Sequence, residues 1–128
     1  GTIDVIACDH APHGRTDKEV EFEYATNGIS GLETSLALSL TLIGNKILKW
    51  PELITRMSLN PARILNIPKG TLQEGADADI TVIDPELKWT VDARTFRSRG
   101  KNTPFNKYQW QGKAVMTIVG GEIKYDGR

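Results

Sequence analysis

The stretch that decides the fold is Ile3-Asp4-Val5-Ile6-Ala7-Cys8-Asp9-His10-Ala11-Pro12-His13. Residues 3–8 favour β structure almost without interruption, which predicts a short strand covered on both faces, as in a parallel sheet. Asp9 follows this strand directly, at the end where α/β barrels collect catalytic side chains. The stretch therefore indicates an α/β fold with polar chemistry at the mouth of a buried strand.

A long loop and then helices are expected next. Residues 9–29 are polar and lack periodicity, and loops of this length are usually functional or disordered. Ser30-Gly31-Leu32-Glu33 matches a Ser-x-x-Glu capping box at a helix start. The apolar residues that then fall on one helix face are Leu32, Leu36, Leu40 and Ile43. Gly44-Asn45 predicts the end of this helix, and prolines near the first turn predict two more, Pro51 to Met57 and Asn60 to Leu65.

Beyond Pro68 the sequence predicts short strands. Residues 79–84 alternate in polarity, and residues 89–91 favour β structure. Residues 113–119 and 122–125 flank Gly120-Gly121, which supplies the positive φ that a two-residue hairpin turn requires. We therefore expect two regions, 1–66 with α/β character and 67–128 as a small β domain.

Bulk composition excludes several classes of protein. Acidic and basic residues balance at 16 each, so we expect no nucleic-acid partner and no anionic membrane surface. The longest apolar stretch, residues 36–43, is far shorter than the roughly 20 residues of a membrane-spanning helix. The single cysteine fits a reducing compartment, and the cytoplasm is the expected location.

Asp9 and His13 are the candidate functional residues. An aspartate at a strand end can ligate a divalent ion and also transfer a proton. A histidine can ligate a metal or donate to an anionic substrate. The residue types alone leave an alternative open, since an aspartate here can simply bond the backbone of a turn. Two histidines and one aspartate at this spacing also do not match a closed zinc site.

The opening stretch resembles the last barrel strand and following loop of the dihydroorotases, which belong to the amidohydrolase superfamily. The Asp-His-Ala-Pro-His motif is specific, because related hydantoinases and allantoinases usually lack its second histidine. The similarity continues in order over essentially the whole chain, through residues 28–34, 58–62, 70–72, 75–79, 102–105, 112–115 and 117–127. These later motifs are common to many amidohydrolases.

The resemblance implies the C-terminal portion of a (β/α)8 barrel, residues 1–66, followed by the small β domain, residues 67–128. The implied reaction is reversible hydrolysis of dihydroorotate to N-carbamoyl-aspartate in pyrimidine synthesis. The implied cofactor is zinc, as one or two ions. The family's other metal ligands lie upstream, so this chain alone should be inactive and should need the missing N-terminal part or a second copy.

Residue roles follow from the same resemblance. Asp9 matches a metal-binding aspartate that serves as general acid and base, and His13 matches a residue that contacts the substrate carboxylate. Asn27 and Gly28 fall where the family presents loop backbone to the substrate, although Asn27 replaces the usual phenylalanine. His10 has no clear role in the family.

Two alternatives stay open. One is a hydantoinase or allantoinase type of cyclic-amide hydrolase, against which His13 argues. The other is a non-catalytic dihydroorotase-like subunit that scaffolds a partner enzyme, such as the transcarbamoylase of the same pathway.

Overall fold

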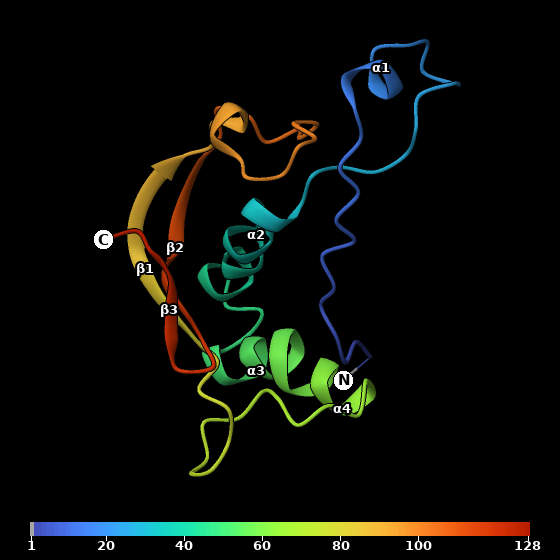
Figure 1. Cartoon of the computed structure of the whole chain (residues 1–128). Coiled ribbons are helices and arrows are strands. Elements are labelled where there is room, and N and C mark those ends of the chain that lie inside the picture. The colour runs from blue at the N-terminus through green and yellow to red at the C-terminus, as the bar shows by residue number, and fades with distance from the viewer. Residues whose placement is uncertain (1) are drawn as a thin grey trace.

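The computed structural model describes residues 2–128 and combines helices with one sheet (Figure 1). Residue 1, where the first expected region begins, lies outside the described residues. The helices are α1 (Arg15–Lys18), α2 (Leu32–Gly44), α3 (Trp50–Ile54), the π-helix η1 (Thr55–Leu59), α4 (Asn60–Ile64) and the 3-10 helix η2 (Ala93–Thr95). The strands are β1 (Ile80–Thr90), β2 (Gln109–Val119) and β3 (Glu122–Asp126). No helix among the described residues has the length and apolar character needed to cross a membrane.

The three strands form an antiparallel sheet in the order β1-β2-β3. The expected hairpin is confirmed: β2 and β3 are joined by Gly120 and Gly121, whose φ angles are 57° and 82°. Both angles lie in the left-handed region that glycine adopts without steric cost.

β1 replaces the two separate strands expected at residues 79–84 and 89–91. Its pairing with β2 is irregular between Asp84 and Lys88, around Pro85. The Asp84 carboxylate accepts from the backbone N–H groups of Glu86 and Leu87 at 2.9 and 3.1 Å. A proline is tolerated at such a bulge of an edge strand, so the chain bends there and continues in the same strand.

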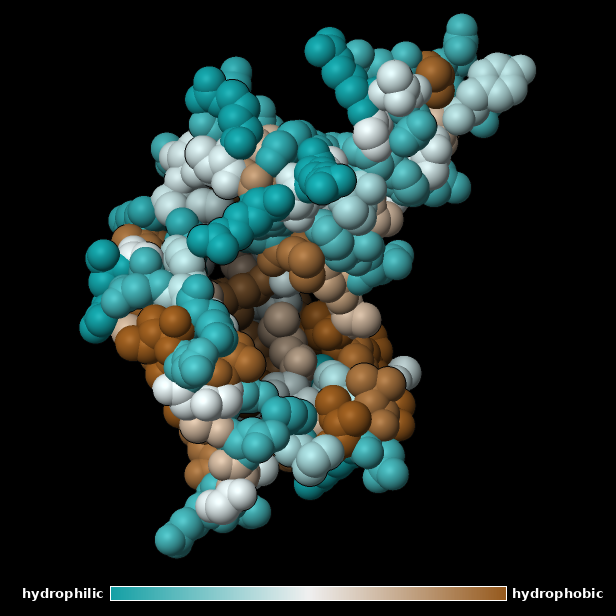
Figure 2. All heavy atoms as spheres, viewed as in Figure 1, coloured by the Kyte–Doolittle hydropathy of each residue, from teal (hydrophilic) through white to brown (hydrophobic). Residues whose placement is uncertain are grey.

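α2 packs against β2, and the span of this helix agrees with the sequence (Figure 1). The approach is close at Gly112, where a Cβ atom would lie 2.2 Å from Cδ1 of Leu40. The expected apolar face is buried only in part, since Leu32 is 59% exposed. The buried residues of α2 are instead Thr34, Ala37 and Ser39. Figure 2 shows apolar side chains around the hollow beside this helix, whereas polar residues dominate the projecting end of the molecule that carries α1.

The expected strand at residues 3–8 is wrong for the described structure. The segment is extended, but it pairs with no strand in residues 2–128, and its nearest approach to sheet geometry is one parallel bridge between His10 and Ile29. Its backbone instead meets Arg56, whose carbonyl accepts from the Ile6 N–H at 3.1 Å and whose Nε donates to the Ile3 carbonyl at 3.1 Å. A strand requires a hydrogen-bonding neighbour, and a helix end cannot supply a ladder.

Candidate functional site

Asp9 has a left-handed backbone conformation. Its φ is +46°, in the left-handed region that non-glycine residues seldom occupy. The carboxylate is exposed, and it makes no side-chain hydrogen bond within residues 2–128. Backbone strain of this kind often accompanies functional sites. The geometry therefore leaves the Asp9 carboxylate available for a ligand.

His13 and Gly28 are brought together by the loop. The Ala11 N–H donates to the Ile29 carbonyl at 2.8 Å, which holds the two arms of the loop side by side. Gly28 has a φ of 109°, and a Cβ atom there would lie 2.4 Å from Cβ of Ala11 and 3.6 Å from Nε2 of His13. Only glycine fits this position. The neighbouring Asn27 is exposed.

Basic side chains surround His13. A hollow of about 320 Å³ beside it is lined by His13, Gly14, Arg15, Lys18, Glu19, Arg99, Lys101 and Asn102. Lys18 donates from Nζ to the carbonyls of Thr26 and Gly28, at 2.6 and 3.2 Å. Excess positive charge of this kind favours an anionic ligand.

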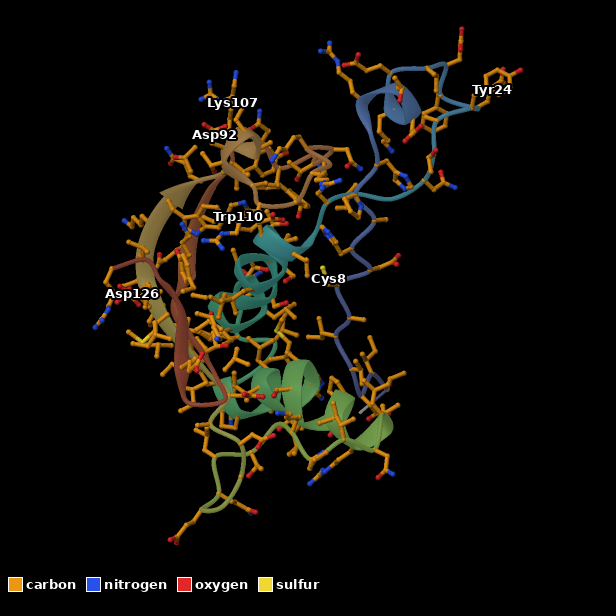
Figure 3. The ribbon with its side chains drawn as sticks, viewed as in Figure 1. Cys8, Tyr24, Asp92, Lys107, Trp110 and Asp126 are labelled. Atoms are coloured by element: carbon orange, nitrogen blue, oxygen red, sulfur yellow. The ribbon has the colours of Figure 1, made fainter. Side chains whose placement is uncertain are left out.

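His10 has a structural role that the sequence did not indicate. Its Nδ1 accepts from the backbone N–H groups of Gly31 and Leu32, at 3.1 and 3.3 Å, at the start of α2. The capping-box prediction is thus wrong: a histidine distant in sequence caps the helix, and Ser30 and Glu33 bond elsewhere. The Cys8 side chain lies beside this helix start (Figure 3), where a Cβ at Gly31 would be 3.0 Å from Sγ.

Glu33 and Ser98 complete a network with His10. The Ser98 hydroxyl donates to Oε1 of Glu33 at 2.7 Å and lies 3.4 Å from Nε2 of His10. Because Nδ1 accepts and the Ser98 hydrogen is used on Glu33, the His10 proton belongs on Nε2. Burial raises the pKa of Glu33, but the hydrogen bonds from Ser98 and from its own backbone N–H, together with His10, outweigh it, so the pKa lies below its ordinary value.

Asn102 is the second residue whose role the sequence left unassigned. It follows Gly100 in the connection between β1 and β2 and contacts both arms of the loop. The sequence pointed to Asn102 only through the motif Asn102-Thr103-Pro104-Phe105, which resembles one found in many amidohydrolases.

The residues present fit a metal site only in part. Asp9 offers a hard carboxylate oxygen, which suits a divalent ion. Within residues 2–128, however, no three His, Cys, Asp or Glu side chains gather closely enough to hold one. Protein metal sites usually need three or four ligands, so the described residues do not form a complete metal site by themselves.

Parts of two solved hydantoinase structures have this fold. The chain is similar to the L-hydantoinase of Arthrobacter aurescens, with a TM-score of 0.90 and 38% identity, covering 99% of this chain and 30% of that one. It is also similar to a D-hydantoinase from Thermus sp., with a TM-score of 0.87 and 27% identity, over 100% of this chain and 30% of that one.

Curated relatives are more similar in sequence. The dihydroorotase of Syntrophus aciditrophicus is 63% identical over 125 residues, which are 98% of this chain and 29% of that protein. The dihydroorotase of Geobacter metallireducens is 54% identical over 125 residues, 98% of this chain and 30% of that protein. The chain thus spans about 30% of the length of the relatives that it matches. The model of the amidohydrolase family matches residues 1–124, and the chain therefore belongs to this family.

Proposed function

We propose that the chain is the C-terminal part of a dihydroorotase, which hydrolyses dihydroorotate reversibly to N-carbamoyl-aspartate. The observation that carries the proposal is the motif of Asp9 to His13, within a chain 63% identical to a dihydroorotase over 125 residues. The strained backbone of Asp9 agrees with a reactive carboxylate, and the basic side chains that line the hollow at His13 agree with an anion site.

Asp9 is the proposed general base and acid. Hydrolysis forms a bond from a water oxygen to the ring carbonyl carbon and breaks the bond from that carbon to the ring nitrogen. The Asp9 carboxylate takes a proton from the water and returns it to the departing nitrogen. Its exposure and its lack of side-chain partners within the described residues support this role.

His13, Asn27 and Gly28 are the proposed substrate-binding residues. His13 donates to the substrate carboxylate, and residues 27–28 present their backbone to the ring. The tight contact of Gly28 with Ala11 supports a fixed arrangement of the two loop arms. A fixed pose is the main requirement for rapid attack by water.

Zinc, as one or two ions, is the proposed cofactor, and Asp9 is the ligand that this chain would provide. A bound divalent ion lowers the pKa of water towards about 7 and polarises the carbonyl that is attacked. The remaining ligands would come from the rest of the protein.

The larger architecture and the setting are further proposals. Residues 1–66 would complete a (β/α)8 barrel and residues 67–128 a small β domain, in a cytoplasmic protein. Residues 3–8 pair with no strand among residues 2–128, which supports a barrel partner for this segment outside the described residues. The missing N-terminal part or a second copy of the chain would cover residues 3–8. A transcarbamoylase is a further proposed partner, and gel filtration of the full-length protein mixed with a transcarbamoylase tests for a complex.

The test is a substrate panel on the full-length protein that contains this chain. Zinc-loaded protein is assayed with dihydroorotate, hydantoin and dihydrouracil. We expect dihydroorotate to be preferred, because the other two lack the carboxylate that His13 binds. Preference for hydantoin would support the alternative suggested by the likeness to L-hydantoinase. Absence of turnover in a zinc-binding, folded protein would instead favour a scaffolding subunit.

A further inference from the structure

The carboxamide of Asn102 joins the connection between β1 and β2 to both arms of the 9–29 loop. Its Oδ1 accepts from the His13 N–H at 3.1 Å. The same oxygen lies 3.0 Å from the Ser30 hydroxyl, whose single hydrogen is shared with the Gly100 carbonyl at 2.7 Å. Its Nδ2 donates to the carbonyls of Gly28 and Ala11, at 3.1 and 3.4 Å. Asn102, which lies in the connection between β1 and β2, thus holds both arms of the 9–29 loop.

Both ends of this carboxamide are used, which fixes its orientation. If its oxygen and nitrogen were exchanged, the amide donors would face the His13 N–H and the new oxygen would face the Gly28 carbonyl. Both contacts would be repulsive. The Asn102 backbone adds a further tie, since its carbonyl accepts from the Ser30 N–H at 2.9 Å.

Gly100 brings the same connection against the His13 backbone. A Cβ atom at Gly100 would lie 2.7 Å from the His13 oxygen and 2.8 Å from its nitrogen. The connection therefore contacts His13 directly at two points, Gly100 and Asn102.

We infer that Asn102 is a positioning residue for substrate binding: it sets the backbone of His13 and Gly28, and through them the site for the substrate carboxylate. The inference rests on the proposed dihydroorotase function. Asn102 makes no hydrogen bond to Asp9 among the described residues. Its loss should therefore weaken substrate binding more than it slows proton transfer.

Asn102→Asp in the full-length zinc-loaded protein is the test. Aspartate has the same shape, but its second oxygen faces the Gly28 and Ala11 carbonyls and repels them. We expect KM for both dihydroorotate and N-carbamoyl-aspartate to rise by about tenfold or more, because binding loses correctly placed groups. The value of kcat should stay within about threefold, with unchanged zinc content.

Asn106→Asp is the matched control. Asn106 lies in the same connection, and its Oδ1 accepts from the Ala93 N–H at 3.0 Å, away from the 9–29 loop. A carboxylate can still accept there, so KM should not change. If Asn102→Asp does not fold, Ser30→Ala is the second variant, because it removes the hydroxyl that contacts both Oδ1 of Asn102 and the Gly100 carbonyl, and it should raise KM by a smaller factor.

The outcomes distinguish a failure of the proposed dihydroorotase function from a failure of the positioning role of Asn102. A wild-type protein that is inactive on dihydroorotate overturns the proposed function and this inference with it. An active wild type whose Asn102→Asp variant has normal KM overturns the inference alone. A fall in kcat together with zinc loss, at unchanged KM, shows a general structural role and also overturns it.

Discussion

Ser98 and Glu33, which are 65 positions apart, are joined by two hydrogen bonds to the same oxygen. The Ser98 N–H and hydroxyl reach Oε1 of Glu33 at 2.9 and 2.7 Å. The pair ties the first turn of α2 to the connection that carries Asn102. The position of the candidate site therefore depends on a contact between two parts of the sequence that look independent.

We expect Glu33→Gln to reduce stability in a pH-dependent way. The pKa of Glu33 is lowered from its ordinary value of 4.5, so its stabilising contribution is present at neutral pH and is lost as the pH falls below 4.5. The variant of the full-length protein should be less stable by about 1 kcal/mol at pH 7. Urea unfolding at pH 7 and below pH 4.5 measures this difference, and an equal gap at both pH values would contradict it.

Local patterns predicted the elements that depend on local forces. The β2–β3 hairpin requires only Gly120-Gly121 and two strands of β-favouring residues, and it is present. The span of α2 follows from its apolar spacing and its end at Gly44. The capping box failed because Ser30 and Glu33 have distant competitors, Asn102 and Ser98, which no window of the sequence contains.

The sequence predicted which reactive side chains the candidate site contains, but not the residue that holds its loop in place. Asp9 and His13 are recognisable from the motif, but Asn102 lies 89 positions from His13. The carboxamide acquires its role only when the β1–β2 connection folds back over the loop. The roles of Asp9, His13, Asn27 and Gly28 stay predictions that the following experiments test.

Asp9→Asn should abolish most turnover in the full-length enzyme. Asparagine keeps the shape of the side chain but cannot carry the proton, so kcat should fall by at least about a hundredfold. Asp4→Asn is the control, because Asp4 is an exposed aspartate of the same segment. Near-normal turnover of Asp9→Asn with unchanged zinc content would exclude the acid–base role.

His13→Ala should affect substrate binding more than metal binding. Removing one hydrogen bond to a charged group costs roughly 1.5–3 kcal/mol, which corresponds to about a tenfold or larger rise in KM. Kinetics and zinc analysis on one preparation measure both quantities. If the variant loses zinc while KM is unchanged, His13 is a metal ligand and its proposed role is wrong.

Gly28→Ala should disturb the loop through a steric clash. Its φ of 109° and the 2.4 Å approach to Cβ of Ala11 leave no room for a methyl group. Gly75→Ala is a matched control, since Gly75 also has a positive φ, 83°, but open space within 4 Å. Both variants share the backbone strain of about 1 kcal/mol. Only Gly28→Ala should raise KM for dihydroorotate, and equal KM values in the two variants would remove Gly28 from the site.

The isolated 128-residue chain should associate in solution. Ile3 is 64% exposed, and the backbone of residues 3–8 bonds mainly to Arg56 and Asn60. Large apolar side chains on the helical side are exposed as well: Ile47, Ile54, Ile64, Leu65 and Ile67. Surfaces of this kind and unpaired strand edges promote pairing with another chain.

Light scattering over a range of concentrations tests this association, and zinc titration of the same samples tests the metal site. We expect masses above that of a monomer and no tight zinc binding, because Asp9 is the one ligand proposed for this chain and three or four are needed. Adding the N-terminal part of the protein should restore both a defined complex and zinc binding. A stable monomer would show that α2 and the sheet bury enough apolar surface by themselves. Tight zinc binding by the isolated chain would mean that further ligands gather around Asp9, and the assignment of this chain as a one-ligand contributor would fail.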